Sequence, residues 1–261
     1  MARTYRDLLP VADRLAPLFY RDEAEGEGMD QLAEVLEAHP QLLIIMNHGP
    51  MLGPAPALTA LVRTMVRHGG GERVPFGVTW RGFHRLPGVG PLAQRLVQTT
   101  AESGVDDLVA KLGGATFNDC AIMPEGEYSN VGNGIDIQPF RSHRFIEAAV
   151  RAQVPVLLLA HSGTARLGRP VPIPSAARFL TAPLPAHLRR ATEQSGVVSL
   201  PRLLGGRIPQ LGLASELYQP DLSPEALAEP GCDQQVAAHA RHVRARLQRL
   251  VNHLVLRFGE D

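Results

Sequence analysis

The sequence predicts an α/β fold in which a mostly parallel central sheet is flanked by helices. Short continuous apolar runs, at residues 42–46 and 154–160, are typical of strands buried on both faces. Segments with helical apolar spacing alternate with these runs, as expected when helices connect parallel strands. The length of 261 residues, with 44% hydrophobic and 20% charged side chains, suits one globular domain over residues 1–261.

The N-terminal segment, residues 1–38, is predicted to be mainly helical. Apolar residues recur at helical spacing over residues 4–21, and we expect this helix to cover the core. An interfacial membrane helix is the alternative interpretation. An acidic turn over residues 22–28 and a short helix over residues 29–38 are expected to follow.

Residues 40–165 are predicted to form the core of the domain, with strands and helices in alternation. The expected strands are residues 42–46, 75–80, 120–123 and 154–160. The expected helices run from Gly53 to about Val66, from residues 103–106 through 107–112, and over residues 141–152. Proline is tolerated in the first turn after Gly53, and Ser103 begins a capping-box pattern.

The remainder of the chain is predicted to differ in character from the core. Residues 166–230 are expected to be irregular, because ten prolines fall between positions 170 and 230. Residues 232–257 are expected to form a C-terminal amphipathic helix with one apolar stripe and arginines on the opposite face. The stripe consists of Val236, Ala240, Val243, Leu247, Leu250, Val251 and Leu254, and the arginines are Arg241, Arg244 and Arg249.

Composition and charge exclude several classes of protein. Lys plus Arg equals Asp plus Glu, at 26 each, so no overall positive field attracts nucleic acid. Cys120 and Cys232 are too few for a disulfide framework or a cysteine-based metal cluster, and no metal site is expected. The longest strongly apolar run, residues 154–160, is far shorter than the roughly 20 residues of a membrane-spanning helix. We expect a cytoplasmic protein and leave open peripheral contact with the inner face of the membrane.

Polar residues follow three of the predicted strands, where the active sites of open α/β sheets lie. Asn47 and His48 follow the first strand, residues 80–85 (WRGFHR) the second, and residues 124–127 (PEGE) the third. A lone histidine is often structural. A histidine between a buried strand and a Gly/Pro turn is placed to act as a base near neutral pH.

Four segments in this order resemble the glycerolipid acyltransferase superfamily, which includes lysophosphatidic acid acyltransferases, and are closest to bacterial members related to the diacylglycerol acyltransferase branch. The matching segments are NHGPMLG (47–53), FHRLPGVGPLAQRL (83–96), IMPEGEYSN (122–130) and QVPVLLLA (153–160). The resemblance implies an acyltransferase-like fold and transfer of a fatty acyl group to a hydroxyl or amine of a small or lipid acceptor. The donor would be an acyl thioester, on coenzyme A or on acyl carrier protein, and no other cofactor is implied.

The resemblance also implies roles for individual residues. His48 would be the general base, and backbone amides near Gly49 or in the Gly126 turn would stabilise the tetrahedral oxyanion. Glu125 would shape the acceptor site. The residues expected to bind substrate are Asn47, Gly49, Arg81, His84, Arg85, Pro124, Gly126, Glu127 and Tyr128.

One departure from the family concerns position 53, where the family has an aspartate that orients the histidine and this chain has Gly53. Loss of such an aspartate lowers turnover by about 10⁴ in serine proteases. Three alternatives follow: another acid substitutes, the backbone holds His48, or acyl transfer is lost and the chain binds a lipid or acyl chain. Glu125 is the first candidate acid and Glu127 the second, and one of them is expected within hydrogen-bond reach of the His48 imidazole, directly or through one water. Alternatively, Glu125 only shapes its loop by accepting backbone hydrogen bonds.

A second departure concerns the acceptor. Lysophosphatidic acid acyltransferases have Thr-Arg-Ser after Pro-Glu-Gly, and that arginine binds phosphate; here the residues are Glu127, Tyr128 and Ser129. A carboxylate and a phenol are poor phosphate ligands. The sequence therefore favours a neutral hydroxyl or amine acceptor. A hydrolase or thioesterase on the same fold is a further alternative.

Overall fold

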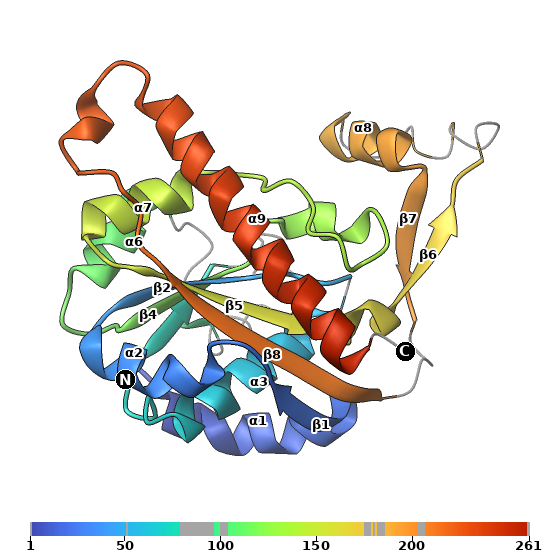
Figure 1. The fold of residues 1–261 in the computed structure, drawn as a ribbon, viewed down its shortest axis with the longest axis horizontal. Helices are drawn as coiled ribbons and strands as arrows, with labels where there is room; N and C mark the ends of the chain where they lie inside the picture. Colours follow the sequence, from blue (N-terminus) through green and yellow to red (C-terminus); the bar gives the residue numbers. More distant parts are fainter. Residues whose placement is uncertain are drawn as a thin grey trace.

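The protein is described by a computed structural model that covers residues 2–50, 52–78, 97–99, 104–174, 179, 181, 186–202 and 207–259. A six-stranded sheet lies at its centre, with the strand order β1-β8-β5-β2-β4-β3 (Figure 1). The strands are β1 (Tyr20–Glu25), β2 (Leu42–Met46), β3 (Pro75–Gly77), β4 (Asp119–Ile122), β5 (Val156–Ser162) and β8 (Ile208–Tyr218). All neighbouring pairs are parallel except β5 and β8, so the predicted α/β class with a mostly parallel sheet is confirmed.

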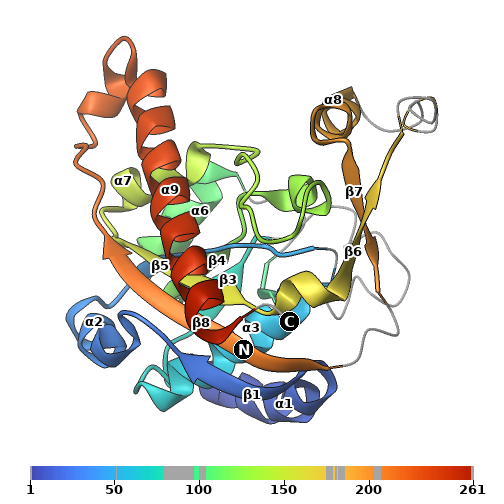
Figure 2. The same ribbon diagram turned by 45° about the vertical axis from the view of Figure 1, so that its right-hand side comes forward.

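Helices cover both faces of this sheet (Figures 1 and 2). One face is covered by α1 (Tyr5–Phe19), α2 (Leu32–Ala38) and α3 (Pro54–Arg67), and the other by α6 (Val105–Leu112), α7 (Arg144–Ala152) and α9 (Cys232–Phe258). The first helix begins with the capping box of Thr4 and Asp7, which satisfies two backbone N–H groups at its start. The helices predicted in the core and at the C-terminal end are present, and α7 begins three residues later than expected.

The two faces of β2 show why its sequence is apolar without interruption. Leu43 and Ile45 pack against the side of α6, α7 and α9, whereas Leu42, Ile44 and Met46 pack against the side of α1, α2 and α3. All five side chains have no exposed surface. Successive side chains of a strand point to opposite faces, so a strand covered on both faces needs apolar residues at every position.

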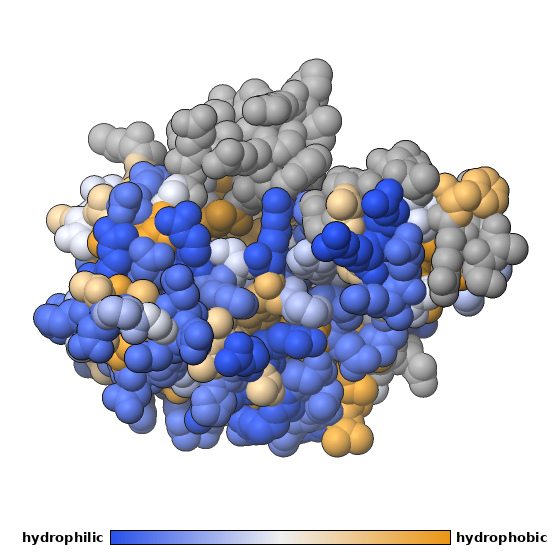
Figure 3. Space-filling model, turned by 90° about the horizontal axis from the view of Figure 1, so that it is seen from above, coloured by the Kyte–Doolittle hydropathy of each residue, from blue (hydrophilic) through white to orange (hydrophobic). Residues whose placement is uncertain are grey.

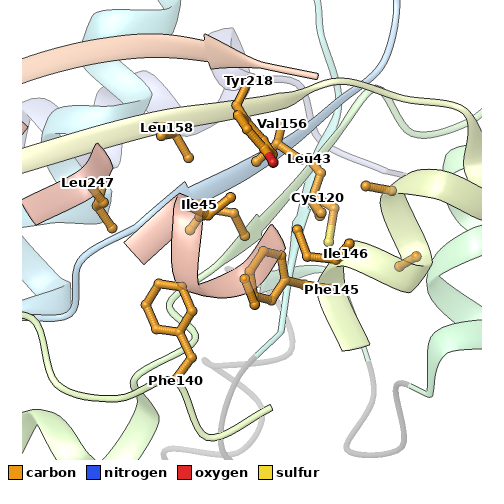
Figure 4. Packing of buried hydrophobic residues seen from close by; sticks show 14 of the residues in the cluster. Leu43, Ile45, Cys120, Phe140, Phe145, Ile146, Val156, Leu158, Tyr218 and Leu247 are labelled. Atoms are coloured by element: carbon orange, nitrogen blue, oxygen red, sulfur yellow. The ribbon is translucent and has the colours of Figure 1, made fainter. Parts of the chain in front are cut away.

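The long C-terminal helix α9 supplies one wall of the core. All seven residues of its predicted apolar stripe are buried. Figure 4 shows Leu247 over the same face of the sheet as Ile45 and Leu158. Burying a leucine of this kind contributes about 1.5–3 kcal/mol, so the stripe is a large part of what holds α9 in place.

Two sequence predictions about the regular structure are wrong. Residues 20–25 were expected as the end of a helix and a turn, and they form the edge strand β1, whose acidic side chains pair with α3: Glu23 with Arg63 and Arg67, and Glu25 with Arg67. Residues 208–218 were expected in an irregular region, and they form β8 between β1 and β5. Local sequence misses both strands because each depends on a partner far away in the chain.

A second, smaller sheet lies to one side of the central sheet (Figure 1). It consists of β6 (Gly168–Pro172) and β7 (Val197–Pro201), which pair antiparallel, and α8 (Ala186–Ser195) precedes β7. Figures 1 and 2 show these elements projecting to one side of the central sheet. None of the helices in the described ranges combines the length and the apolar character that crossing a bilayer requires.

Candidate functional site

Three neighbouring strands bring polar residues to one edge of the sheet. Because β2 pairs in parallel with both β4 and β5, the carboxyl ends of all three strands lie together. His48 follows β2, Glu125 follows β4, and His161 lies near the end of β5. This is the edge at which ligands of open α/β sheets bind, so the site predicted around His48 lies where the topology allows one.

The His48 ring is held through one of its two nitrogens. Its Nδ1 lies 2.8 Å from the carbonyl oxygen of Gly49 and 2.9 Å from Oγ of Ser129. The Ser129 hydroxyl donates its own hydrogen to the carbonyl of Gly126 at 2.8 Å, so it faces His48 as an acceptor. Both partners of Nδ1 therefore accept, which places the hydrogen of the neutral ring on Nδ1 and the lone pair on Nε2.

Burial lowers the pKa of the His48 imidazole below its ordinary value of 6.5, and the hydrogen bond to Gly49 opposes this shift without cancelling it. The ring is therefore neutral at neutral pH. A neutral imidazole with its lone pair on Nε2 is the protonation state that a general base requires.

Glu125 supports the backbone of His48 and does not bind its ring. This side chain is 3% exposed, and its Oε1 accepts a hydrogen bond from the backbone N–H of His48 at 2.8 Å. Its Oε2 accepts from the backbone N–H of Gln138 at 2.7 Å. A direct hydrogen bond between Glu125 and the imidazole is not formed, and its carboxylate instead joins the loops after β2 and β4 to the segment around Gln138.

The electrostatics of Glu125 are a balance between burial and hydrogen bonding. Burial raises the pKa of its carboxyl group to about 7, while the two backbone N–H donors and the charge of Arg244 lower it. Near neutral pH the negative charge on Glu125 therefore depends on these three partners.

The C-terminal helix holds the segment that binds Glu125. Arg244 of α9 donates from Nε and Nη2 to the carbonyl of Ile137, at 2.8 and 2.6 Å. Gln248, one turn further along α9, accepts from the backbone N–H of Ile137 at 2.7 Å. A continuous series of hydrogen bonds thus runs from α9 through residues 137–138 and Glu125 to the backbone of His48.

Gly53 is required by the path of the backbone. A Cβ atom at this position would lie 2.5 Å from the carbonyl oxygen of His48 and 3.0 Å from Cα of Gly49. The backbone N–H of Gly53 also donates to the carbonyl of Pro50 at 2.7 Å, which closes a tight turn before α3. No side chain fits here, so the aspartate of the family pattern has no place in this loop.

Asn47 and His161 connect the ends of β2 and β5. The Asn47 amide donates to the carbonyl of His161 at 3.0 Å and accepts from its backbone N–H at 2.9 Å. The His161 ring contacts the Asn47 carbonyl through Nε2 at 2.7 Å and is buried, which lowers its pKa to about 4. Asn47, expected to bind substrate, uses its side chain to fix the strand ends beside His48.

The other predicted site residues have mixed positions. Gly49 and Gly126 adopt left-handed backbone conformations, with φ of 65° and 54°. Glu127 pairs with Arg141 at 3.3 Å, and Tyr128 lies in the 3₁₀ turn Gly126–Asn130. The Pro124 carbonyl accepts a hydrogen bond from the Arg141 backbone. The remaining predicted substrate-binding residues, Arg81, His84 and Arg85, lie outside the described residues.

A small cavity adjoins this site, and sequence reasoning missed several residues around it. The cavity is lined by Asn47, Gly49, Glu125, Ser129, Gly134, Ile135, Asp136 and Ile137. The missed residues that hold the site are Ser129, Gln138, Arg244 and Gln248. Ser129 had a signal, because it occupies the third position after Pro-Glu-Gly, where the family pattern also has serine. The other three had none.

The described part of the chain contains no group of three or more His, Cys, Asp or Glu side chains arranged to hold a metal ion. Comparison of the chain with models of protein families and with curated proteins gives no significant match.

Proposed function

We propose that this chain is an acyltransferase that moves a fatty acyl group from an acyl thioester to a hydroxyl or amine of a small or lipid acceptor. The observation that carries the proposal is the state of His48: a neutral ring with hydrogen on Nδ1 and a lone pair on Nε2, at the carboxyl edge of the sheet. The motif resemblance around residues 47–53 and 122–130 supports the same chemistry.

The reaction needs one proton to move twice. As the acceptor oxygen or nitrogen attacks the thioester carbonyl, Nε2 of His48 takes its proton. The tetrahedral intermediate then collapses with cleavage of the C–S bond, and the imidazolium returns the proton to the leaving thiolate. The products are the acylated acceptor and a free thiol.

The positive charge on His48 during this cycle has local partners that replace the absent aspartate. The Gly49 carbonyl and the Ser129 hydroxyl both accept from Nδ1, and such bonds strengthen when the donor becomes charged. Of the alternatives for position 53, the arrangement favours the one in which the backbone holds His48.

The acceptor is proposed to be a neutral hydroxyl or amine. Position 128, where the phosphate-binding arginine of the family pattern would stand, is a tyrosine, and the nearby Arg141 guanidinium is paired with Glu127. The donor is proposed to be acyl coenzyme A or acyl carrier protein, acting in the cytoplasm.

A second candidate function is binding of a lipid or acyl chain without catalysis. The lack of space for a side chain at Gly53 favours this function, because the carboxylate that orients the histidine in the family pattern cannot be placed there. A third candidate function is that of a thioesterase, in which water takes the place of the acceptor and the thioester is hydrolysed.

Thiol release separates these functions. Purified protein would be given acyl coenzyme A of several chain lengths, with and without a panel of fatty alcohols, monoacylglycerols and amines, and free thiol and acylated product would be measured. We expect thiol release that requires an acceptor and is abolished in His48→Ala. His242→Ala, at an exposed histidine on α9, is the matched control and should keep full activity. Release without an acceptor would indicate a thioesterase, and binding without release would indicate a lipid-binding protein.

A further inference from the structure

The projecting part of the molecule, which we call the arm, consists of the described residues of 166–207, including β6, α8 and β7. Its base adjoins the His48 site. Gly168 is packed against Pro50, since a Cβ there would lie 2.6 Å from the Pro50 side chain, and Val198 of β7 forms a β-bridge with Val131. The arm therefore starts at the loops that hold His48, has β7 and α8 beside the turn Gly126–Asn130, and projects to one side of the central sheet (Figure 2).

The arm is strongly cationic in a chain that has no net charge. The sequence from 166 to 207 contains seven arginines and a single acidic residue, Glu193, which gives a formal charge of +6. Because the whole chain is neutral, the rest of it carries −6. Six of these arginines are in the described part: Arg166, Arg169, Arg189, Arg190, Arg202 and Arg207.

The described arginines of the arm lack the carboxylate partners that many arginines of the body have. In the body, arginines such as Arg63, Arg67 and Arg249 form ion pairs with glutamates or aspartates. Among the described residues, no carboxylate lies within ion-pair distance of any of the six arm arginines. Their charges are thus available to an anionic partner.

Large apolar side chains accompany these charges. Phe179 is 72% exposed and Leu200 is 49% exposed. Figure 3 shows hydrophobic side chains together with strongly hydrophilic ones at the right, where the arm lies. Basic side chains combined with exposed aromatic and aliphatic side chains are typical of surfaces that bind at a membrane interface.

We propose that the arm docks the protein on an anionic lipid bilayer. Lipid headgroups would neutralise the arginines, and the boundary between headgroups and acyl chains would accept Phe179 and Leu200. The charge of −6 on the body is repelled by the same surface, so the molecule would be oriented with its arm toward the bilayer. An acidic protein would meet the charges but would need a pocket for each exposed apolar side chain.

Docking in this way would bring the loops around His48 close to the lipid surface. The inference does not depend on the proposed acyl transfer, and it is tested without donor or acceptor. Failure of vesicle binding and failure of catalysis are therefore distinguishable results.

The test is co-sedimentation with vesicles of phosphatidylcholine alone and of phosphatidylcholine mixed with phosphatidylglycerol. We expect binding to the mixed vesicles only, decreasing as salt rises from about 0.05 to about 0.5 M because the Debye length shortens. The double variant Arg189→Gln/Arg190→Gln should bind about thirtyfold more weakly, since each basic residue near an anionic surface contributes about a factor of five. Phe179→Ser should weaken binding in a way that salt does not change.

The matched control removes the same charge from the body. Arg6→Gln/Arg144→Gln changes two exposed arginines outside the arm and should bind like the unchanged protein. Melting temperatures of all variants establish that each is folded. Equal loss in the arm and body variants would overturn the proposal, because binding would then follow total charge. Absence of binding to anionic vesicles at low salt would also overturn it and assign the arm to another anionic partner, such as an acidic protein.

Discussion

The carboxylate of Glu125 accepts a hydrogen bond from the backbone N–H of His48 at 2.8 Å, and its other oxygen accepts from Gln138. Glu125 therefore positions the backbone of His48, the proposed base, and does not bind its imidazole ring. Orientation of the ring is left to Gly49 and Ser129. This division of roles determines what each substitution should do.

Glu125→Gln should lower both stability and turnover. Glutamine keeps one acceptor oxygen and turns an NH₂ group toward a backbone N–H, which leaves one buried donor unsatisfied. The expected loss is about 1–3 kcal/mol of unfolding free energy, measured by urea denaturation, together with slower acyl transfer because the His48 backbone shifts. Glu72→Gln, which removes the ion pair between the exposed side chains of Glu72 and Arg6, should change stability by less than about 1 kcal/mol. Unchanged stability in Glu125→Gln would contradict the role assigned to its two oxygens.

Ser129→Ala should reduce turnover without unfolding the protein. It removes one of the two acceptors at Nδ1 while Gly49 still fixes the tautomer. A hydrogen bond to a group that becomes charged contributes about 1.5–3 kcal/mol, so we expect kcat to fall at least about tenfold. Ser223→Ala, at an exposed serine, is the control. Wild-type kcat in Ser129→Ala would leave the Gly49 carbonyl as the sole partner that matters.

Gly53→Asp should damage the protein even though it restores the residue of the family pattern. The new Cβ would lie 2.5 Å from the His48 carbonyl, and overpacking of this kind costs about 1–3 kcal/mol. Gly104→Asp is a matched control, because Gly104 also precedes a helix and has open space around it. That variant should be neutral or slightly stabilising, as aspartate is a good N-cap residue. Thermal melting of both variants tests the prediction, and higher activity in Gly53→Asp would refute it.

The pH dependence of stability should contain two opposing contributions. The pKa of His161 is lowered from 6.5 to about 4, so its contribution is present above pH 6.5 and is lost as pH falls through 4. The pKa of Glu125 is raised from 4.5 to about 7, so its contribution is present below pH 4.5 and is lost as pH rises through 7. Each amounts to about 3 kcal/mol. Unfolding free energies measured across this range should therefore rise more steeply with pH in Glu125→Gln than in the unchanged protein, and less steeply in His161→Gln.

In the Glu125→Gln variant, which lacks the other group that titrates near this site, the acid side of the pH–activity profile should reflect His48. Burial lowers its pKa, so kcat/KM should hold down to pH values below 6.5 and decline only when the ring becomes protonated. The decline is measured on the free enzyme with subsaturating donor. An acid limb above pH 6.5 would mean that another group controls the reaction.

The sequence was a good guide wherever an element is buried by its immediate neighbours in the chain. The apolar run of β2 and the stripe of α9 are read directly from periodicity, and both are buried as expected. The strand β1 was missed because it lies at the sheet edge and carries Asp22, Glu23 and Glu25, which a local pattern reads as a solvated turn. The arginine partners of Glu23 and Glu25 on α3 are about forty positions away.

The position of the candidate site could be predicted from the sequence, but the hydrogen-bond partners of its residues could not. His48 and Glu125 were identified from strand ends, and the structure brings their loops together. The hydrogen-bond partners of the two Glu125 oxygens could not be predicted, because they are backbone N–H groups, which every residue except proline has. Arg244 was expected only on the helix face opposite the apolar stripe, and its guanidinium binds a carbonyl 107 residues away.

The pairing of β1 with β8 has a consequence for the order of assembly. The Ser215 hydroxyl of β8 bonds the Gly28 carbonyl, 187 residues earlier, and within the central sheet β8 is the only neighbour of β1 among the described strands. At about 5–20 residues per second, a ribosome needs roughly 10–40 s to make that intervening length. Throughout this interval the backbone groups of Tyr20–Glu25 lack their sheet partner. Charged side chains disfavour pairing of an exposed strand edge with other chains. Asp22, Glu23 and Glu25 are therefore expected to limit aggregation of β1 while β8 is still being synthesised, and to do the same at the sheet edge of the folded protein.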